Sequence, residues 1–330
     1  MKTVKNILLL FLFFNCSCFS YSVTNLIIEP DQGEKPIVNA INDADHSIDL
    51  VMYGFTDKKI RNAIINAKKR GVAIRIILEK EPYLSDGENT ATLKIVKHNG
   101  IIIKNGSKDL ALTHQKTLII DNDKAWIMTM NFTRSGFMHQ RNFGALITAK
   151  PGVNEIETIF NSDWQDKKIP KNFKPNLVWS PLNSRTVINQ LILQARHTLT
   201  IYAPELSDYQ IIGSLAKAAE HGVAVTLLMP AQQNPVFEKK LSYLIQHHVH
   251  VCFSKTLAIH AKMILADSGE PQQTAYLGSA NLTTASLDNN RELGILINNP
   301  GILTKLHHTF LMDYSASTLK LPLCIQCRLG

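Results

Sequence analysis

Apolar residues recur along this chain with two periods, one typical of helices and one typical of strands. Apolar side chains three and four positions apart predict helices over 37–44, 59–70 and 211–220. Compact β-branched runs predict buried strands: "SIDLVMYGF" (47–55), "VAIRIIL" (72–78), "TLTIYAP" (198–204) and "VAVTLLM" (223–229). Gly71 and Gly222 each follow a predicted helix, where glycine commonly ends one. Short strand–helix–strand connections predict an α/β fold with helices covering a sheet.

The same order of elements occurs twice. Residues 37–80 align with 187–230, and "RNFGALI" (141–147) aligns with "RELGILI" (291–297), each about 150 positions further on. We therefore expect two duplicated α/β halves with mostly parallel sheets, packed about a pseudo-twofold axis. Sites in open α/β sheets lie at the carboxyl ends of strands, which here would be where the two halves face each other.

The repeat also predicts domain boundaries. The stretch "KKIPKNFKPN" (167–176) is basic and contains proline, as linkers often do. We expect a signal peptide (1–22), a first half (24–150), a linker region (151–174), a second half (175–320) and a C-terminal tail (321–330).

The first residues have the order of a secretory signal. Lys2 and Lys5 precede an apolar run from Ile7 to Phe14, and Ser20 and Ser22 are small residues that suit a cleavage site. This apolar run is too short to span a bilayer comfortably. We expect a cleaved signal and a secreted protein that associates with its target membrane, with an uncleaved anchor as the alternative.

The five cysteines carry little chemical information. Cys16 and Cys18 belong to the predicted signal, and Cys252 lies in a strand-like run as an inert core thiol. Cys324 and Cys327 form "CIQC", which is compatible with a disulfide, with lipidation or with two unmodified thiols. A single CxxC is weak support for zinc.

Composition and charge narrow the class of partner. Hydrophobic residues make up 45% of the 330 residues and charged residues 19%, which excludes a disordered chain. The net charge of +8 and the pI near 9.1 favour an anionic partner, such as a nucleic acid, an anionic lipid surface or an acidic small molecule. A basic surface without a specific partner is the alternative.

Two apolar runs carry the same polar triplet, H-x-K-x-x-x-x-D. Residues two apart on a strand point to one face, so each His and Lys project together from one edge of the sheet. A polar stretch containing asparagine follows each triplet, over 128–136 and 278–286. The candidate site residues are His114, Lys116, Asp121 and Asn131 in the first copy, and His260, Lys262, Asp267 and Asn281 in the second.

These residue types suit a phosphate group. A lysine buried beside a histidine favours an anion, because an unpaired charge in a dry site is costly. Two lysines and two asparagines would converge as a compact set of donors. A histidine can attack phosphorus and, because it titrates near neutrality, can also transfer protons.

Each residue has an ordinary structural interpretation as well. A lone histidine in an apolar run is more often a core residue, a lone lysine extends to solvent, and an aspartate after a strand belongs to a turn. Zinc would explain paired His and Asp, but a lysine two positions after each histidine would repel it. The joint recurrence of the triplet at matching places in both halves favours a shared site.

The two motifs, "HQKTLIID…MTMN" and "HAKMILAD…GSAN", resemble the HKD motifs of the phospholipase D superfamily, and the resemblance covers almost the whole mature chain. It implies a phosphodiesterase that needs no metal or other cofactor. One histidine would form a phosphohistidine, and the other would protonate the leaving alcohol and then activate water or another alcohol. We favour His114 as the nucleophile and His260 as the acid and base.

The same resemblance implies supporting roles. Asp121 and Asp267 would orient the histidines and stabilise their charge. The phosphoryl oxygens would be bound and stabilised by a set of donors and supporting side chains: Lys116, Lys262, Asn131, Thr129, Asn281, Ser279 and Glu292.

The two copies are not equal. The second keeps Gly278 and Ser279 before its asparagine, and Glu292 after it, as in the family's pattern. The first has Met128 and Thr129, and Asn142 at the position of Glu292. Because Asn142 has no carboxylate, we expect the half-site around His114 to have the weaker charge support.

The resemblance leaves several functions open. We favour a secreted phospholipase D that hydrolyses membrane glycerophospholipids to phosphatidic acid, with transphosphatidylation as a side reaction. The alternatives are a metal-independent endonuclease with nucleic acid as substrate, a cardiolipin-synthase-like phosphatidyltransferase, and a non-catalytic phosphate- or lipid-binding module. Because both motifs lie in one chain, we expect a monomer.

Overall fold

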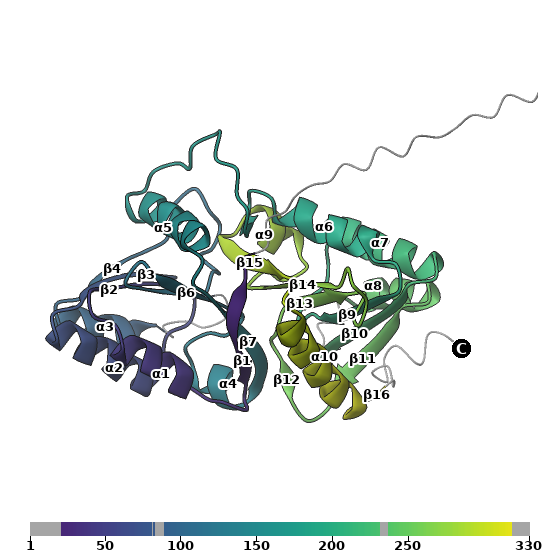
Figure 1. Cartoon of the computed structure of the whole chain (residues 1–330), viewed down its shortest axis with the longest axis horizontal. Helices are drawn as coiled ribbons and strands as arrows, with labels where there is room; N and C mark the ends of the chain where they lie inside the picture. Colours follow the sequence, from purple (N-terminus) through teal and green to yellow (C-terminus); the bar gives the residue numbers. More distant parts are fainter. Residues whose placement is uncertain (1–20, 81, 83–88, 232–236, 319–330) are drawn as a thin grey trace, which may run out of the picture.

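The structure is a computed structural model that describes residues 21–80, 82, 89–231 and 237–318 (Figure 1). Residues 1–20 of the expected signal peptide, with Cys16 and Cys18, lie outside the described residues. The C-terminal tail 321–330, with Cys324 and Cys327, also lies outside them.

Each half of the chain forms one sheet. The first sheet has the strand order β1-β7-β6-β5-β2-β3-β4, and β12 (Ala258–Ile259) of the second half pairs with Gln140 and Arg141 at the start of β7. Its strands are β1 (Val23–Glu29), β2 (Ser47–Met52), β3 (Ala73–Leu78), β4 (Ile102–Lys104), β5 (Thr117–Ile120), β6 (Lys124–Met128) and β7 (Gln140–Ile147). Its helices are α1 (Lys35–Asn42), α2 (Lys58–Lys69), α3 (Thr90–His98), α4 (Arg134–Met138) and α5 (Lys150–Trp164).

The second sheet repeats this plan in the order β16-β11-β10-β9-β13-β14-β15-β8. The strands of this half are β8 (Val178–Ser180), β9 (Thr198–Tyr202), β10 (Ala224–Pro230), β11 (His250–Ser254), β12 (Ala258–Ile259), β13 (Met263–Ala266), β14 (Thr274–Gly278), β15 (Glu292–Ile297) and β16 (Ser317–Thr318). Its helices are α6 (Ser184–Gln194), α7 (Tyr209–Glu220), α8 (Glu238–Gln246), α9 (Thr284–Asp288) and α10 (Pro300–Ser315).

The duplicated α/β halves are confirmed, but the expectation of mostly parallel sheets is wrong. The parallel neighbours are β2-β3-β4, β9-β10-β11 and the short pair of β12 with β7. The other neighbours in each sheet are antiparallel. The reason lies in the turn after each triplet. Asp121 and Asn122 have φ of 54° and 52°, which lets β5 turn back into β6 as a hairpin.

The predicted helices agree with the structure within a few residues, for the expected local reasons. Asp57 and Asp208 cap the first turns of α2 and α7 by accepting hydrogen bonds from backbone N–H groups. Gly71 and Gly222 follow these helices with φ of 97° and 90°, which glycine adopts without strain.

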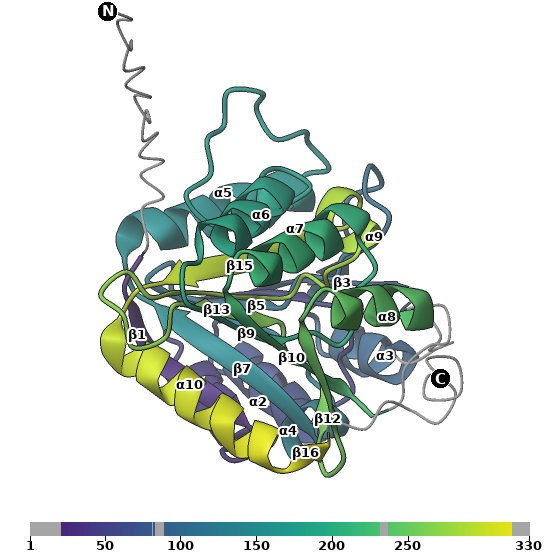
Figure 2. The same cartoon turned by 90° about the vertical axis from the view of Figure 1, so that its right-hand side faces the viewer.

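The helices and sheets stack in layers. Apolar residues of α1, α2 and α3 pack on the outer face of the first sheet, and those of α6, α7 and α8 pack on the outer face of the second. The inner faces share one core with α5 and α10. Figures 1 and 2 show α6 and α7 on one side of the second sheet and α10 on the other. Residues 151–174, expected as a linker, therefore begin with most of a packed helix, α5.

The two halves exchange equivalent contacts. Arg141 binds Asp313 with Nε–Oδ2 at 2.7 Å, and Arg291 binds Asp163 with Nε–Oδ2 at 2.8 Å. Each arginine begins or precedes a matching strand, and each aspartate lies in the last helix of the opposite half. Such reciprocity is what a twofold relation between repeats produces.

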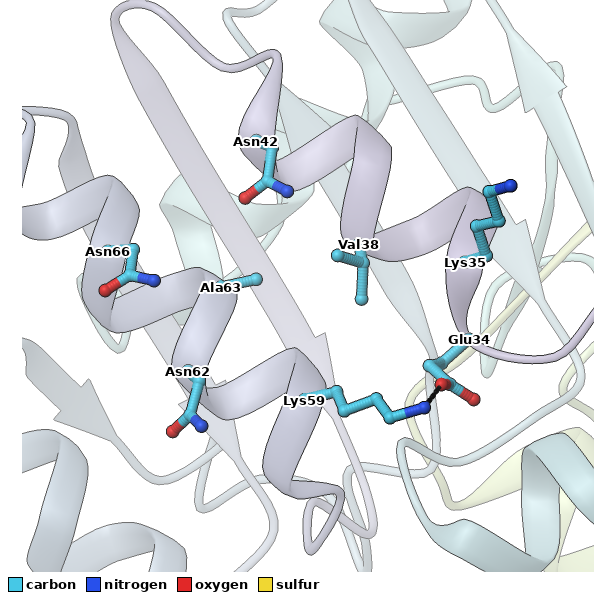
Figure 3. Close-up of a pocket in the computed structure, with 8 residues that line it drawn as sticks. All are labelled: Glu34, Lys35, Val38, Asn42, Lys59, Asn62, Ala63 and Asn66. Atoms are coloured by element: carbon cyan, nitrogen blue, oxygen red, sulfur yellow. Dashed lines mark hydrogen bonds and ion pairs between the residues drawn. The ribbon is translucent and has the colours of Figure 1, made fainter.

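Two surface features complete the fold. Helices α1 and α2 line a groove of about 510 Å³, with the Lys59–Glu34 ion pair at one end and Asn42 and Asn66 toward the other (Figure 3). Among the helices of the described residues, none is long and apolar enough to cross a membrane.

Candidate active site

The first histidine is supported from the opposite half. His114 lies just before β5, and its backbone N–H donates to the carbonyl of Arg291 at 3.0 Å. Its Nδ1 lies 2.9 Å from both Oε1 and Oε2 of Glu292, the first residue of β15. Because a carboxylate can only accept, Nδ1 carries the proton and Nε2 has the free lone pair.

The second histidine has the reciprocal environment with one chemical difference. The backbone N–H of His260 donates to the carbonyl of Arg141 at 3.1 Å, and its Nδ1 lies 2.9 Å from Oδ1 of Asn142. The Asn142 amide N donates to the carbonyl of Gly136 at 3.1 Å, which fixes the amide orientation. His260 therefore also has a protonated Nδ1, but its acceptor is neutral.

Both lysines of the triplets are buried beside the histidines. Lys116 is 1% exposed and donates to the carbonyl of His114 at 2.5 Å, and Lys262 is 2% exposed and donates to the carbonyl of His260 at 2.8 Å. Lys262 Nζ also lies 3.3 Å from Nε2 of His260. Burial lowers the pKa of Lys116 well below its usual value and that of Lys262 to about 8. A bound anion would stabilise their ammonium forms.

The residues downstream of each triplet have different hydrogen-bond partners. Asn131 accepts a hydrogen bond from the N–H of Gly54 at 3.3 Å through Oδ1, and Asn281 Oδ1 is buried without a hydrogen-bond partner among the described residues. The hydroxyl of Thr129 donates to Asn142 Oδ1 at 2.8 Å. Ser279 accepts from the N–H of Leu293 at 3.1 Å. Thr129 and Ser279 are therefore supports of the strand ends on which Asn142 and Glu292 lie.

The expected role of the two aspartates is wrong. Asp121 accepts hydrogen bonds from the N–H groups of His46 and Ser47, both at 2.7 Å, at the start of β2. Asp267 does the same with His197 at 2.7 Å, at the start of β9. A four-residue strand separates each aspartate from its lysine, at about 3.3 Å per residue. The aspartates join strands at the far end of the sheet and do not contact the histidines.

The expectation that the half-site around His114 has the weaker charge support is also wrong. Each repeat supplies the support for the other repeat's histidine, so Glu292 of the second copy supports His114 of the first. Asn142 of the first copy supports His260 of the second. The histidine without a carboxylate is therefore His260. A repeat alignment matches equivalent positions of the two copies, such as Asn142 and Glu292, and does not show which histidine each of them contacts.

Burial sets the charge state of the site. Burial, reinforced by Lys116 and Lys262, lowers the pKa of His114 to about 4 even though Glu292 opposes this shift. Burial and the same lysines lower the pKa of His260 well below its usual value. Burial alone would raise the pKa of Glu292, but His114 and Lys116 lower it overall. Both imidazoles are therefore neutral at neutral pH, beside an ionised carboxylate.

Two residues at the site were missed by sequence reasoning. Tyr53 packs edge-on against His114 with ring centroids 4.9 Å apart, and its ring centroid lies 5.1 Å from Lys116 Nζ. Ser286 donates to Oε1 of Glu292 at 2.9 Å. Tyr53 reads as one more apolar residue of a strand, and Ser286 as a helix-start residue, so neither carried a signal.

Within the part of the chain that the structure describes, no group of three or more His, Cys, Asp or Glu side chains is placed to bind a metal ion. The donors at the site are instead imidazole, ammonium and amide groups, which suit a phosphate.

Replacing Asp267 by Asn is expected to lower the free energy of unfolding by about 1–3 kcal/mol at pH 7, because a charged acceptor of backbone N–H groups is lost. Hydrogen bonds to the backbone, acting against burial, lower the pKa of Asp267. Its contribution is thus present above the unfolded pKa and is lost as pH falls through the folded pKa. Urea unfolding of both proteins should show the difference shrinking in acid. Turnover per folded molecule should not change. A large loss of turnover would show that Asp267 does support catalysis.

Comparison with known proteins gives a family and several relatives. Residues 37–164 and 188–314 match the protein family described as "Cardiolipin synthase, PLD-like domain". Cardiolipin synthase A of Wigglesworthia glossinidia brevipalpis is 25% identical over an alignment of 336 residues, covering 86% of this chain and 66% of that protein. Phospholipase D of Rickettsia conorii is 30% identical over 156 residues, covering 47% of this chain and 74% of that protein.

A solved structure shows the same fold. Polyphosphate kinase of Porphyromonas gingivalis superposes with a TM-score of 0.70 at 17% identity, over 87% of this chain and 46% of that chain. At this identity the likeness concerns the fold alone. The chain spans just under two thirds of the length of the cardiolipin synthase that it matches.

Proposed function

Because this chain belongs to the phospholipase D-like family, we propose that it is a phosphodiester-acting enzyme that hydrolyses glycerophospholipids to phosphatidic acid. The observation that carries the proposal is the pair of histidines, each supported from the opposite half and each next to a buried lysine. This pair offers a nucleophile and a proton donor within one anion-binding site.

In the first step, His114 Nε2 attacks phosphorus, an N–P bond forms and the bond from phosphorus to the headgroup oxygen breaks. Attack makes the ring of His114 cationic, and the adjacent Glu292 carboxylate stabilises that charge. His260, protonated at Nε2, donates its proton to the departing alkoxide. An anionic phosphodiester raises the pKa of His260 by supplying an opposite charge, which favours the protonated form on binding.

In the second step, neutral His260 accepts a proton from water, whose oxygen attacks phosphorus as the N–P bond breaks. His114 returns to its neutral form and phosphatidate leaves. Through both steps the two lysines and the amides of Asn131 and Asn281 would bind the phosphoryl oxygens, on which negative charge accumulates. An alcohol in place of water would give transphosphatidylation by the same steps.

A second candidate is phosphatidyl transfer to a lipid alcohol. The match to a cardiolipin synthase over 86% of this chain favours it, since the phospholipase D match covers 47%. Purified protein with labelled phosphatidylglycerol would separate the two, because hydrolysis releases phosphatidic acid and glycerol whereas transfer yields cardiolipin and glycerol. Labelled DNA in a parallel reaction tests the nuclease alternative. Release of nucleotides without any lipid product would refute both lipid activities.

The expected export and monomeric state belong to the same proposal. Lys2, Lys5 and the apolar run that follows support export, and the presence of both half-sites in one chain supports a complete site in a monomer.

EDTA is expected to leave the rate unchanged, because the two histidines, the lysines and the amides supply every group that the proposed steps use. Initial rates before and after dialysis against EDTA check this expectation. Loss of activity that returns on adding a divalent cation would contradict the two-histidine mechanism.

Replacing Asn142 by Asp is expected to move the basic limb of the kcat/KM profile to higher pH. The new carboxylate would lie at the position of Oδ1, 2.9 Å from Nδ1 of His260, and would raise the pKa of that imidazole. Since His260 acts as an acid, kcat/KM falls as pH rises through its pKa, so a higher pKa delays the fall. A pH–rate profile that does not move, in a variant that folds normally, would limit Asn142 to a structural role.

A further inference from the structure

The second half presents an aromatic and basic groove between α7 and α8. Tyr209 and Tyr243 are 78% and 42% exposed, which is unusual for such large rings. Figure 2 shows the two helices near each other. The groove has a volume of about 600 Å³ and is lined by Tyr209, Ile212, Gly213, Lys239, Lys240 and Tyr243. We call these six residues the α7–α8 groove.

The fold does not require this set of residues. Counting back from Gly71 and Gly222, the first half has Lys58, Arg61 and Asn62 where the α7–α8 groove has Tyr209, Ile212 and Gly213. Both halves repeat the same plan of strands and helices, yet among the described residues the two exposed tyrosines at this place belong to the second half. An exposed aromatic pair that the repeated fold can omit points to a binding role.

Hydrogen bonds connect the α7–α8 groove to the rim of the candidate active site. Lys240 Nζ donates to the carbonyl of Ser207 at 2.7 Å, and the N–H of Ser207 donates to the carbonyl of Leu282 at 2.9 Å. Leu282 directly follows Asn281, whose amide is proposed above to bind the phosphoryl oxygens. Two hydrogen bonds thus join the α7–α8 groove to the residue that follows Asn281.

The chemistry of the groove fits one partner. Lys240 Nζ lies 4.4 Å from the ring centroid of Tyr209, where a cationic ligand would otherwise stack. Lys239 is exposed, and the chain carries a net charge of +8. Tyrosine rings settle at the headgroup level of a bilayer, and lysines beside them attract anionic headgroups.

We propose that the α7–α8 groove is the site through which the protein docks on an anionic phospholipid bilayer. Tyr209 and Tyr243 insert among the headgroups while Lys239 and Lys240 bind their phosphates. The inference rests on the proposed function, because a bilayer is the natural form of the substrate.

The test measures binding of a catalytically silent full chain, His114→Asn, to vesicles of phosphatidylcholine with and without phosphatidylglycerol. We expect cosedimentation only when phosphatidylglycerol is present. Lys239→Gln should weaken it about fivefold, the contribution of one basic residue near an anionic surface. The double variant Tyr209→Ser, Tyr243→Ser should weaken it at least as much.

The matched control is Leu311→Ser, Met312→Ser on α10, on the opposite side of the second sheet, where the side chains are 48% and 59% exposed. This control should bind vesicles as the parent does. Absence of vesicle binding by the parent, unchanged binding of the tyrosine variant, or equal loss in the control would overturn the proposal.

A second measurement separates this inference from the proposed function. With His114 intact, the tyrosine variant should still hydrolyse a short-chain phospholipid that is dissolved as monomers, and should lose rate only on vesicles. If the parent binds vesicles but hydrolyses no phospholipid, the proposed function fails while the docking surface remains. Loss of the monomer reaction in the tyrosine variant would place the tyrosines in the reaction and overturn the docking role.

Discussion

Replacing His114 by Asn is expected to lower phospholipid turnover by roughly 10⁴-fold or more, because the group that forms the bond to phosphorus is lost. Replacing His260 by Asn should also stop turnover, but for a different reason. His114 would still attack a substrate whose leaving group needs no proton, such as a nitrophenyl phosphodiester. The second step would then lack its base, and the phosphohistidine would accumulate.

The two variants can be compared with a nitrophenyl phosphodiester that carries its label in the part that stays attached to phosphorus. We expect one burst of nitrophenol and one equivalent of acid-labile label on the His260→Asn protein, and neither on His114→Asn. If label is found only on His114→Asn, then His260 is the nucleophile and His114 is the acid and base. Normal turnover in either variant would refute the two-histidine mechanism.

The fold could be predicted from sequence to the level of its repeat, and not to the level of its strand directions. The β-branched runs and the helix-ending Gly71 and Gly222 are local signals, and they were sufficient for β2, β3, β9 and β10 and for the helices α2 and α7 that connect them. The hairpin after β5 depends on positive φ at Asp121 and Asn122. An aspartate inside a repeated motif suggested chemistry, which concealed its role in a turn.

The candidate site shows the same limit. His114 and Lys116 come close to His260 and Lys262. Each pair lies in the segment just before β5 or β13, not on the strand where the sequence placed it. The pairing of Glu292 with His114 depends on how two strands far apart in sequence meet across the interface of the halves. A sequence repeat reveals equivalent positions. It does not reveal that each supporting residue contacts the histidine of the other half.

Replacing Glu292 by Gln is expected to lower kcat by about 10²–10³-fold with little change in KM, because the lost interaction matters most when the ring of His114 becomes cationic. Glutamine keeps the shape of the side chain and an oxygen that can accept from Nδ1, so the imidazole stays in place. Only the negative charge disappears.

A control is needed because Glu292 is 1% exposed and beside Lys116, so the substitution also leaves a buried ammonium with less compensation. Glu155→Gln provides it: this carboxylate is 7% exposed and accepts from the backbone N–H of Leu177 and from Nε1 of Trp179, both at 2.9 Å, away from the histidines. Urea unfolding of both variants measures the cost of losing a buried carboxylate, and kcat at saturating substrate measures catalysis. Comparable kcat in the two variants would mean that Glu292 supports the fold and not the phosphohistidine. If kcat falls only in Glu292→Gln, the negative charge of Glu292 stabilises the cationic ring of His114 in the first chemical step.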